Sequence, residues 1–204
     1  KDAGVPLVIS LGYTADDIAQ LAPRVAPFAD ALELSTHYIG DDPGPMQAAI
    51  RAAKAAVDVP VLVKLSPFRD MRAAALAAAQ AGADGIVAVN SYGPCLAIDA
   101  ETGQLLMGSR DGYGWLSGPA LKPLALRCVF DVARAVDLPI IGVGGIRSGV
   151  ERVVYYLPNG PPERGPLGVA GGDGAEPSRT GRVLSRLLVA AFALPAIAAG
   201  PERF

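Results

Sequence analysis

Three polar residues of this chain stand at the ends of two predicted strands, where side chains often do chemistry. Lys64 lies near the end of the apolar run 59–65, and Asn90 and Ser91 follow the apolar run that begins at Gly85. An ammonium group held there can stabilise negative charge that develops on a bound ring, and an amide beside a hydroxyl offers donors and acceptors to a small polar ligand. The alternatives are a lysine that reaches past the strand end to water and a polar turn at Asn90.

Two glycine pairs form a second set of candidates. Gly118 follows Ser117, and Gly144 and Gly145 follow Val143 at the end of another apolar run. A glycine has no Cβ, so the backbone N–H groups around it can approach phosphate oxygens closely. Two such loops in succession are a common phosphate cradle in α/β barrels. Together with the polar strand ends they indicate a flavin site, although a plain tight turn is the simpler explanation of either pair alone.

A third candidate is His37, the only histidine of the chain, which stands beside Tyr38 after a predicted strand. Either side chain could act as a general base, and the histidine could bind an anionic substrate; a solvated loop histidine is the alternative. Glu33 lies inside the preceding strand, where a buried carboxylate needs a partner. Lys64 on the next strand is the obvious partner, and that pair can be purely structural.

The elements that must position these residues follow a regular order. Short β-rich runs alternate with alanine-rich helical patterns, which is typical of βα units around a parallel sheet. We expect a helix to begin after Thr14, whose hydroxyl suits an N-cap. The polar segment 91–114 is expected to be a long loop over the site. The predicted strands are 5–11, 31–35, 59–65, 85–90 and 138–143, and the other predicted helices are 46–57, 70–81 and 122–136.

Composition narrows the class of protein. The chain has 204 residues, 51% of them hydrophobic, and a net charge of -2, which suits one soluble domain with a sizeable core. Its Lys and Arg residues form no basic stripe, which argues against a nucleic-acid partner. Cys95 and Cys128 form no metal-binding or disulfide pattern, and no signal sequence is evident, so we expect a reducing cytoplasm. We expect the apolar run 183–199, interrupted by Pro195, to be a core or interface helix and not a membrane span.

Five motifs occur in order over roughly residues 5–150. They are Ala-Leu-Glu-Leu at 31–34, Pro-Val-Leu-Val-Lys-Leu-Ser-Pro at 60–67, Ala-Gly-Ala-Asp-Gly at 81–85 with Asn-Ser at 90–91, Leu-Ser-Gly-Pro-Ala-Leu-Lys-Pro at 116–123, and Pro-Ile-Ile-Gly-Val-Gly-Gly-Ile at 139–146. Their wording and spacing resemble the dihydroorotate dehydrogenase family, chiefly its class 1 branch. Agreement over five consecutive units is far more specific than any single glycine pair.

The resemblance implies a (β/α)8 TIM barrel that holds FMN and an oxidoreductase of pyrimidine biosynthesis. It implies that two hydrogens leave across a C–C bond, one as a proton to a base and one as hydride to the flavin. Lys64 would lie against the flavin ring, and Asn90 with Ser91 would match contacts to the substrate ring. The phosphate-side positions would be Ser117, Gly118, Gly144 and Gly145, with Val143 beside them.

The chain departs from the family pattern in three places. The class 1 loop Asn-x-Ser-Cys-Pro-Asn corresponds here to residues 35–40, which hold neither the two asparagines nor the cysteine base. Tyr38 stands at the base position with His37 beside it, so either could take the proton, with Lys64 as the third catalytic candidate. The chain is also expected to begin near the third strand of the barrel, without the first two βα units. The last strand of the phosphate site is not evident after Arg147.

We therefore expect residues 1–157 to form a partial (β/α) barrel that binds FMN and substrate, with 158–204 unassigned: a Pro/Gly-rich segment and an apolar C-terminal helix. The leading hypothesis is an FMN-dependent dehydrogenase acting on a dihydropyrimidine-like small molecule, with an altered substrate loop. One alternative is a non-catalytic fragment or interaction subunit of the same family. Another is a barrel that isomerises or cleaves phosphosugars. A homo-oligomer, or a partner, would cover the open barrel edges.

Overall fold

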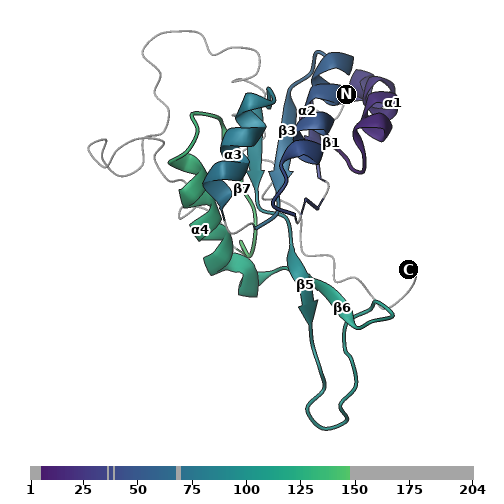
Figure 1. The fold of residues 1–204 in the computed structure, drawn as a ribbon, viewed down its shortest axis with the longest axis vertical. Helices are drawn as coiled ribbons and strands as arrows, with labels where there is room; N and C mark the ends of the chain where they lie inside the picture. Colours follow the sequence, from purple (N-terminus) through teal and green to yellow (C-terminus); the bar gives the residue numbers. More distant parts are fainter. Residues whose placement is uncertain (1–5, 36, 39, 68–69, 148–204) are drawn as a thin grey trace.

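The computed structural model describes residues 6–35, 37–38, 40–67 and 70–147. These residues form a parallel sheet of five strands in the order β1-β2-β3-β4-β7, with helices against it and a two-stranded hairpin that projects from the body (Figure 1). The sheet strands are β1 (Val8–Leu11), β2 (Ala31–Leu34), β3 (Val61–Leu65), β4 (Gly85–Ala88) and β7 (Ile140–Gly142). The helices are α1 (Ala15–Val25), α2 (Gly44–Ala56), α3 (Met71–Gln80) and α4 (Lys122–Ala133).

The strand order is that of a barrel. Each sheet strand pairs in parallel with the sheet strand that precedes it in the chain, and the order does not reverse as it does in a doubly wound sheet. The predicted alternation of strands and helices is thus confirmed for the described residues. The predicted segments 158–204, including the helix at 183–199, lie outside them. Among the described helices, none is long and apolar enough to cross a bilayer.

Local sequence explains where two of the helices begin. The side chain of Thr14 accepts the backbone N–H of Asp17, and the carboxylate of Asp17 accepts the backbone N–H of Thr14 at 3.1 Å. This reciprocal capping confirms the hydroxyl cap predicted before α1. At α3 the cap is a single contact, in which the carboxylate of Asp70 accepts the backbone N–H of Ala73 at 2.9 Å.

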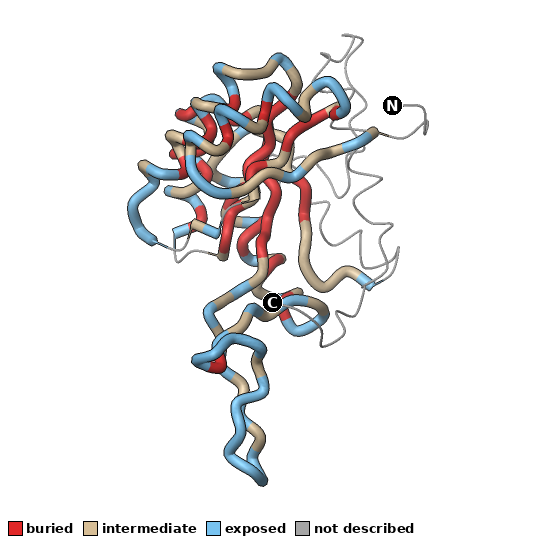
Figure 2. The backbone as a smooth tube through the Cα atoms, turned by 90° about the vertical axis from the view of Figure 1, so that its right-hand side faces the viewer, coloured by how far each residue is buried: buried red, intermediate tan, exposed pale blue. Residues whose placement is uncertain are grey.

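The sheet carries two apolar layers because alternate residues of a strand point to opposite faces. Leu32, Val63 and Ile86 face the helices and belong to the main core. Ala31, Leu62 and Val87 form a smaller cluster on the other face, made of strand residues alone. Figure 2 shows the buried strands at the centre of the molecule. The helix-free face corresponds to the interior of a barrel.

The segment 91–114 is only partly the long loop that we expected. Its first residues form β5 (Tyr92–Leu96), which pairs antiparallel with β6 (Tyr113–Leu116), Leu96 lying opposite Tyr113, and the residues between the two strands connect them as a hairpin. Gly93 and Pro94 inside β5 hide the alternation that marks a strand, and the polar turn residues dominate the composition. The hairpin extends away from the sheet and is largely exposed (Figures 1 and 2).

Candidate active site

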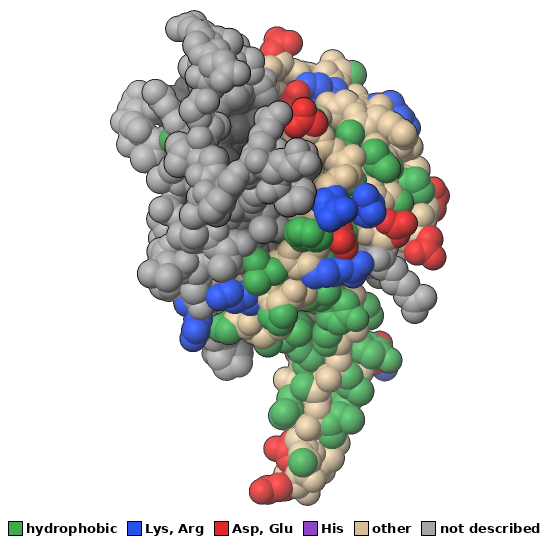
Figure 3. All heavy atoms as spheres, turned by 90° about the vertical axis from the view of Figure 1, so that its left-hand side faces the viewer, with side chains coloured by type: hydrophobic (Ala, Val, Ile, Leu, Met, Phe, Trp, Pro, Cys, Tyr) green, Lys and Arg blue, Asp and Glu red, His purple; other side chains and the backbone are tan. Residues whose placement is uncertain are grey.

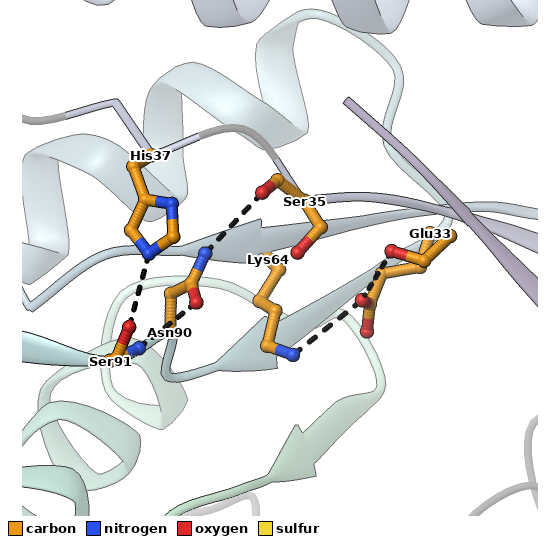
Figure 4. A network of polar contacts seen from close by, with 7 residues as sticks. Glu33, Ser35, His37, Lys64, Asn90 and Ser91 are labelled. Carbon is orange, nitrogen blue, oxygen red and sulfur yellow. Dashed lines mark hydrogen bonds and ion pairs between the residues drawn. The ribbon is translucent and has the colours of Figure 1, made fainter. Parts of the chain in front are cut away.

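A row of polar side chains crosses the helix-free face of the sheet. The hydroxyl of Ser10 on β1 donates to Oε1 of Glu33 on β2 at 3.0 Å, and Nζ of Lys64 on β3 lies 3.6 Å from the same oxygen. Figure 4 shows the lysine reaching across the strands toward Glu33. The predicted pairing of Lys64 with Glu33 is confirmed. About four-fifths of each side chain is shielded from solvent, so removal of either charge would leave the other one buried without a partner of opposite sign.

A second polar group lies where β2 and β4 end. Nε2 of His37, in the loop after β2, is 3.1 Å from Oγ of Ser91, which follows β4 (Figure 4). The imidazole also packs against the indole of Trp115 on β6, with ring centroids 4.1 Å apart and planes inclined by 40°. Three segments that are distant in sequence therefore meet at this histidine.

Asn90 forms hydrogen bonds to two of these segments, the one after β2 and the one after β4. Its side-chain oxygen accepts the backbone N–H of Ser91 at 2.9 Å, and its side-chain nitrogen donates to the carbonyl oxygen of Ser35 at 3.4 Å. Its own backbone N–H donates to the carbonyl oxygen of Leu65 at 2.8 Å, and the residue is buried. The side chain of Asn90 thus bonds to the backbone of the next residue and, through its amide nitrogen, to the segment that leads to His37.

The surroundings of His37 favour a neutral imidazole. Partial burial lowers the pKa of His37 because it disfavours the charged ring, and the positive charge of Lys64 lowers that pKa further. A neutral ring has one nitrogen that accepts a hydrogen bond. His37 is therefore suited to act as a proton acceptor at neutral pH.

Tyr38 has different surroundings from its neighbour. It packs against the core between the sheet and the helices, and its hydroxyl oxygen is buried. It lines a cavity of about 280 Å³ near the starts of α2 and α3, together with Asp41, Met46 and Asp70. The two residues predicted as alternative bases thus contact different parts of the molecule.

The two glycine loops contact one another in the structure. Gly118 and Gly145 have φ angles of +75° and +72°, and a Cβ placed on Gly145 would lie 2.8 Å from the carbonyl oxygen of Gly118. A Cβ placed on Gly118 would have no neighbour within 4 Å among the residues that the structure describes, so these residues leave the backbone there open to a ligand. Val143 joins this loop to β4, since its N–H donates to the carbonyl oxygen of Ala88 at 2.6 Å. Gly144 and Gly145 after β7 therefore lie at the same end of the sheet as Asn90 and Ser91 after the neighbouring strand β4.

Sequence reasoning missed two residues of this site. Ser10 was not singled out, although its position two residues after Val8 places it on the same face of β1 as an apolar strand residue. Trp115 directly precedes the motif at 116–123, but nothing in that motif assigns it a role. Its contact with His37 depends on the hairpin, which the sequence did not indicate.

Comparisons with known proteins agree with this architecture. The family model for dihydroorotate dehydrogenase matches residues 2–156. The catalytic subunit of dihydroorotate dehydrogenase B (NAD(+)) from Methanocella arvoryzae is 39% identical over 168 residues, which cover 77% of this chain and 54% of that protein. The same subunit from Methanothermobacter thermautotrophicus is also 39% identical over 168 residues, 76% of this chain and 55% of that protein.

A solved structure supports the fold. The dihydroorotate dehydrogenase of Eimeria tenella, determined in complex with ferulenol, superposes with a TM-score of 0.54 at 22% identity, over 69% of this chain and 45% of that one. The predicted α/β TIM-barrel class is confirmed, with five parallel strands in the described residues. The chain spans about half the length of the curated relatives it matches. From its motifs, its strand order and these matches, we conclude that the chain belongs to the dihydroorotate dehydrogenase family.

Proposed function

We propose that this chain serves an FMN-dependent oxidoreductase of dihydroorotate dehydrogenase type, which removes two hydrogens across a C–C bond of a dihydropyrimidine-like substrate. One observation carries the proposal. Asn90 and Ser91 follow β4, and Gly145 follows β7, which is the neighbouring strand of the sheet. Gly118 lies against Gly145. A flavin whose phosphate lies in the cradle would have its ring near the polar strand ends.

The residues present suit FMN, the cofactor of this family. The backbone at Gly118 is open to a ligand, and the close approach of Gly145 leaves no room for a side chain that would block it. Ser117, Gly118, Val143, Gly144 and Gly145 would hold the phosphate end, and Lys64 would lie near the ring. When bound, FMN supplies the acceptor for the hydride.

The remaining roles belong to the side chains beyond β2 and β4. Asn90 and Ser91 would contact the substrate ring through donors and acceptors of both kinds. His37 and Tyr38 are the candidate bases. Of these two we favour His37 as the residue on which a proton ends, because its ring contacts Ser91 whereas the hydroxyl of Tyr38 is buried on the helix side of the sheet.

We propose that this site binds its substrate with a different set of side chains from the set that binds dihydroorotate in class 1 enzymes. Residues 35–40 read Ser-Thr-His-Tyr-Ile-Gly, without the asparagines that the class 1 loop supplies. Asn90 supplies an amide, but it already bonds to Ser35 and to the backbone of Ser91. We therefore propose a dihydropyrimidine-like ring with fewer amide contacts than dihydroorotate receives in class 1 enzymes.

Reconstitution of the full chain with FMN tests this function. We expect a flavin absorption spectrum that survives desalting, and bleaching of that spectrum under anaerobic conditions by one of a series of dihydropyrimidines. Lys64→Met should slow the bleaching about a hundredfold, since it removes a charge near the ring. Lys54→Met is the matched control, because Lys54 pairs with Asp84 at 2.7 Å, away from the cluster. A chain that retains no FMN would contradict the proposal.

We also propose that the chain assembles with a second copy or with another subunit, in the cytoplasm. The relatives named above are catalytic subunits, a name that implies further subunits in those enzymes. Both cysteines are free thiols, which agrees with a reducing compartment. The hairpin exposes Leu96, Ile98, Leu105, Leu106 and Tyr113, the apolar surface visible on the projecting arm in Figure 3. A contiguous surface of this kind is typical of an interface.

A further inference from the structure

We propose that Oγ of Ser91 is the atom that removes the substrate proton, and that Nε2 of His37 receives the proton that Ser91 gives up. This inference rests on the proposed function and deepens it, since it assigns the base of that reaction. It differs from a base in the loop after β2, where the family places one.

The geometry of the pair suits a relay. The two atoms are 3.1 Å apart, within hydrogen-bonding distance. A serine hydroxyl is a poor proton acceptor alone, but a neighbouring base that takes its hydrogen activates it. Partial burial, and to a smaller extent the positive charge of Lys64, lower the pKa of His37, so the ring is held in the form that accepts a proton.

Both partners are held in place by further contacts. The indole of Trp115 packs on the imidazole, and the side chain of Asn90 accepts the backbone N–H of Ser91. The second contact of Asn90, to the carbonyl oxygen of Ser35, fixes the loop of His37 relative to the end of β4. An activated hydroxyl with an oriented base behind it is the arrangement that nucleophilic enzymes use.

The order of the strands decides which partner meets the substrate. Across the sheet, β2, β3, β4 and β7 follow one another, so the loop of His37 and the glycine cradle after β7 lie on opposite sides of the end of β4. Ser91, directly after β4, therefore lies between these two loops in strand order. A substrate ring bound at Asn90 and Ser91, as proposed above, would contact the hydroxyl, with the imidazole 3.1 Å behind it.

The proton step balances as follows. A substrate C–H bond breaks and its proton goes to Oγ of Ser91, while the original hydroxyl hydrogen moves to Nε2 of His37, which becomes an imidazolium. The electron pair of the broken bond would form the C=C bond, and bound FMN would supply the acceptor for the second hydrogen. Lys64 raises the free energy of the imidazolium, which favours return of the proton to solvent after turnover.

A first experiment tests the pair without turnover. His37 is the only histidine, so nitrogen NMR of the untagged, ¹⁵N-histidine-labelled full chain reports on it alone. We expect Nε2 to be unprotonated in the wild type, because it accepts from Ser91. Ser91→Ala should shift the ring toward the tautomer with a protonated Nε2. Ser109→Ala, a change of another serine at an exposed position in the hairpin, is the control and should have no effect. The same tautomer in wild type and Ser91→Ala would overturn the proposal.

A second experiment tests the role of the pair in catalysis. With FMN bound, Ser91→Ala should slow anaerobic flavin reduction at least a hundredfold, the range of a lost general base, and leave the FMN dissociation constant unchanged. His37→Asn should slow it at least tenfold. The double variant should be no slower than Ser91→Ala alone, because the two residues act as one unit.

The possible outcomes distinguish a failure of the proton relay from a failure of the proposed oxidoreductase function. If the wild type reduces its flavin and Ser91→Ala does so at the same rate, or if the two losses multiply in the double variant, the relay is wrong and the function stands. If FMN binds but no dihydropyrimidine reduces it in the wild type, the function and the relay both fail. The NMR result then still shows whether the pair exists.

Discussion

At the scale of single residues, the charge of His37 can be tested directly. Burial is the larger cause of its lowered pKa and Lys64 the smaller, with Glu33 behind the lysine. Lys64→Met should therefore raise the pKa of His37 toward the ordinary value of about 6.5 but not to it. The pKa of His37 is lower in the folded chain than in the unfolded chain. The free energy of unfolding is therefore highest above pH ~6.5, the ordinary histidine value, and decreases as the pH falls from there toward the pKa of the folded state. Histidine NMR titration measures the shift, with Lys54→Met as control; an unchanged pKa in Lys64→Met would contradict the assignment.

Gly145 offers a test of the cradle at the same scale. Its φ of +72° and the 2.8 Å approach to Gly118 both oppose a side chain, whereas Gly103, with φ +69°, has no atom near its absent Cβ. Gly103→Ala should cost about 1–2 kcal/mol of unfolding free energy through backbone strain alone. Gly145→Ala should cost a further ~1–3 kcal/mol from overpacking and should weaken FMN binding. Urea unfolding and flavin titration measure both; equal costs would mean that the loops do not touch.

At the scale of elements, the packing of α4 predicts the reactivity of the two thiols. Cys128 is fully buried in this helix against the sheet, and burial raises the pKa of its thiol to about 11. Cys95 lies on the hairpin and is partly exposed. A thiol reagent at pH 8 should therefore label one cysteine of the native chain quickly, and Cys95→Ser should abolish that phase while Cys128→Ser leaves it intact. Rapid labelling of both cysteines would show that α4 is not docked as described.

The elements also show what the sequence can and cannot predict. The capping pair Thr14 and Asp17 and the apolar run of β3 are local signals, and both appear where they were expected. Glu33 and Lys64 could be paired because neighbouring parallel strands fix which residues lie side by side. The hairpin could not be predicted, since Gly93 and Pro94 weaken its local pattern and its strands are joined through a long polar segment. The contact of Trp115 with His37 could not be predicted either, because it depends on the hairpin.

At the scale of the whole molecule, the regular βα alternation predicts the order of the strands in the sheet. It does not predict which surfaces of the molecule are exposed. Within the described residues, the outer edges of β1 and β7 pair with no further strand. Exposed parallel edges and an apolar hairpin both favour association. These are separate surfaces, however, and an experiment must address them one at a time.

The hairpin is the surface that can be tested without disturbing the sheet. Leu96 and Tyr113 lie opposite one another on β5 and β6 and are 48% and 53% exposed. If two copies bury this face, changing both residues to lysine should halve the mass measured by light scattering, because two positive charges would have to be buried. Phe28→Lys is the matched control, since Phe28 is 64% exposed beyond α1, remote from the hairpin in the chain. A double variant of unchanged oligomeric mass would assign the association to the edges of the sheet and leave the hairpin to its role in holding Trp115 against His37. A wild-type monomer would contradict self-association through either surface.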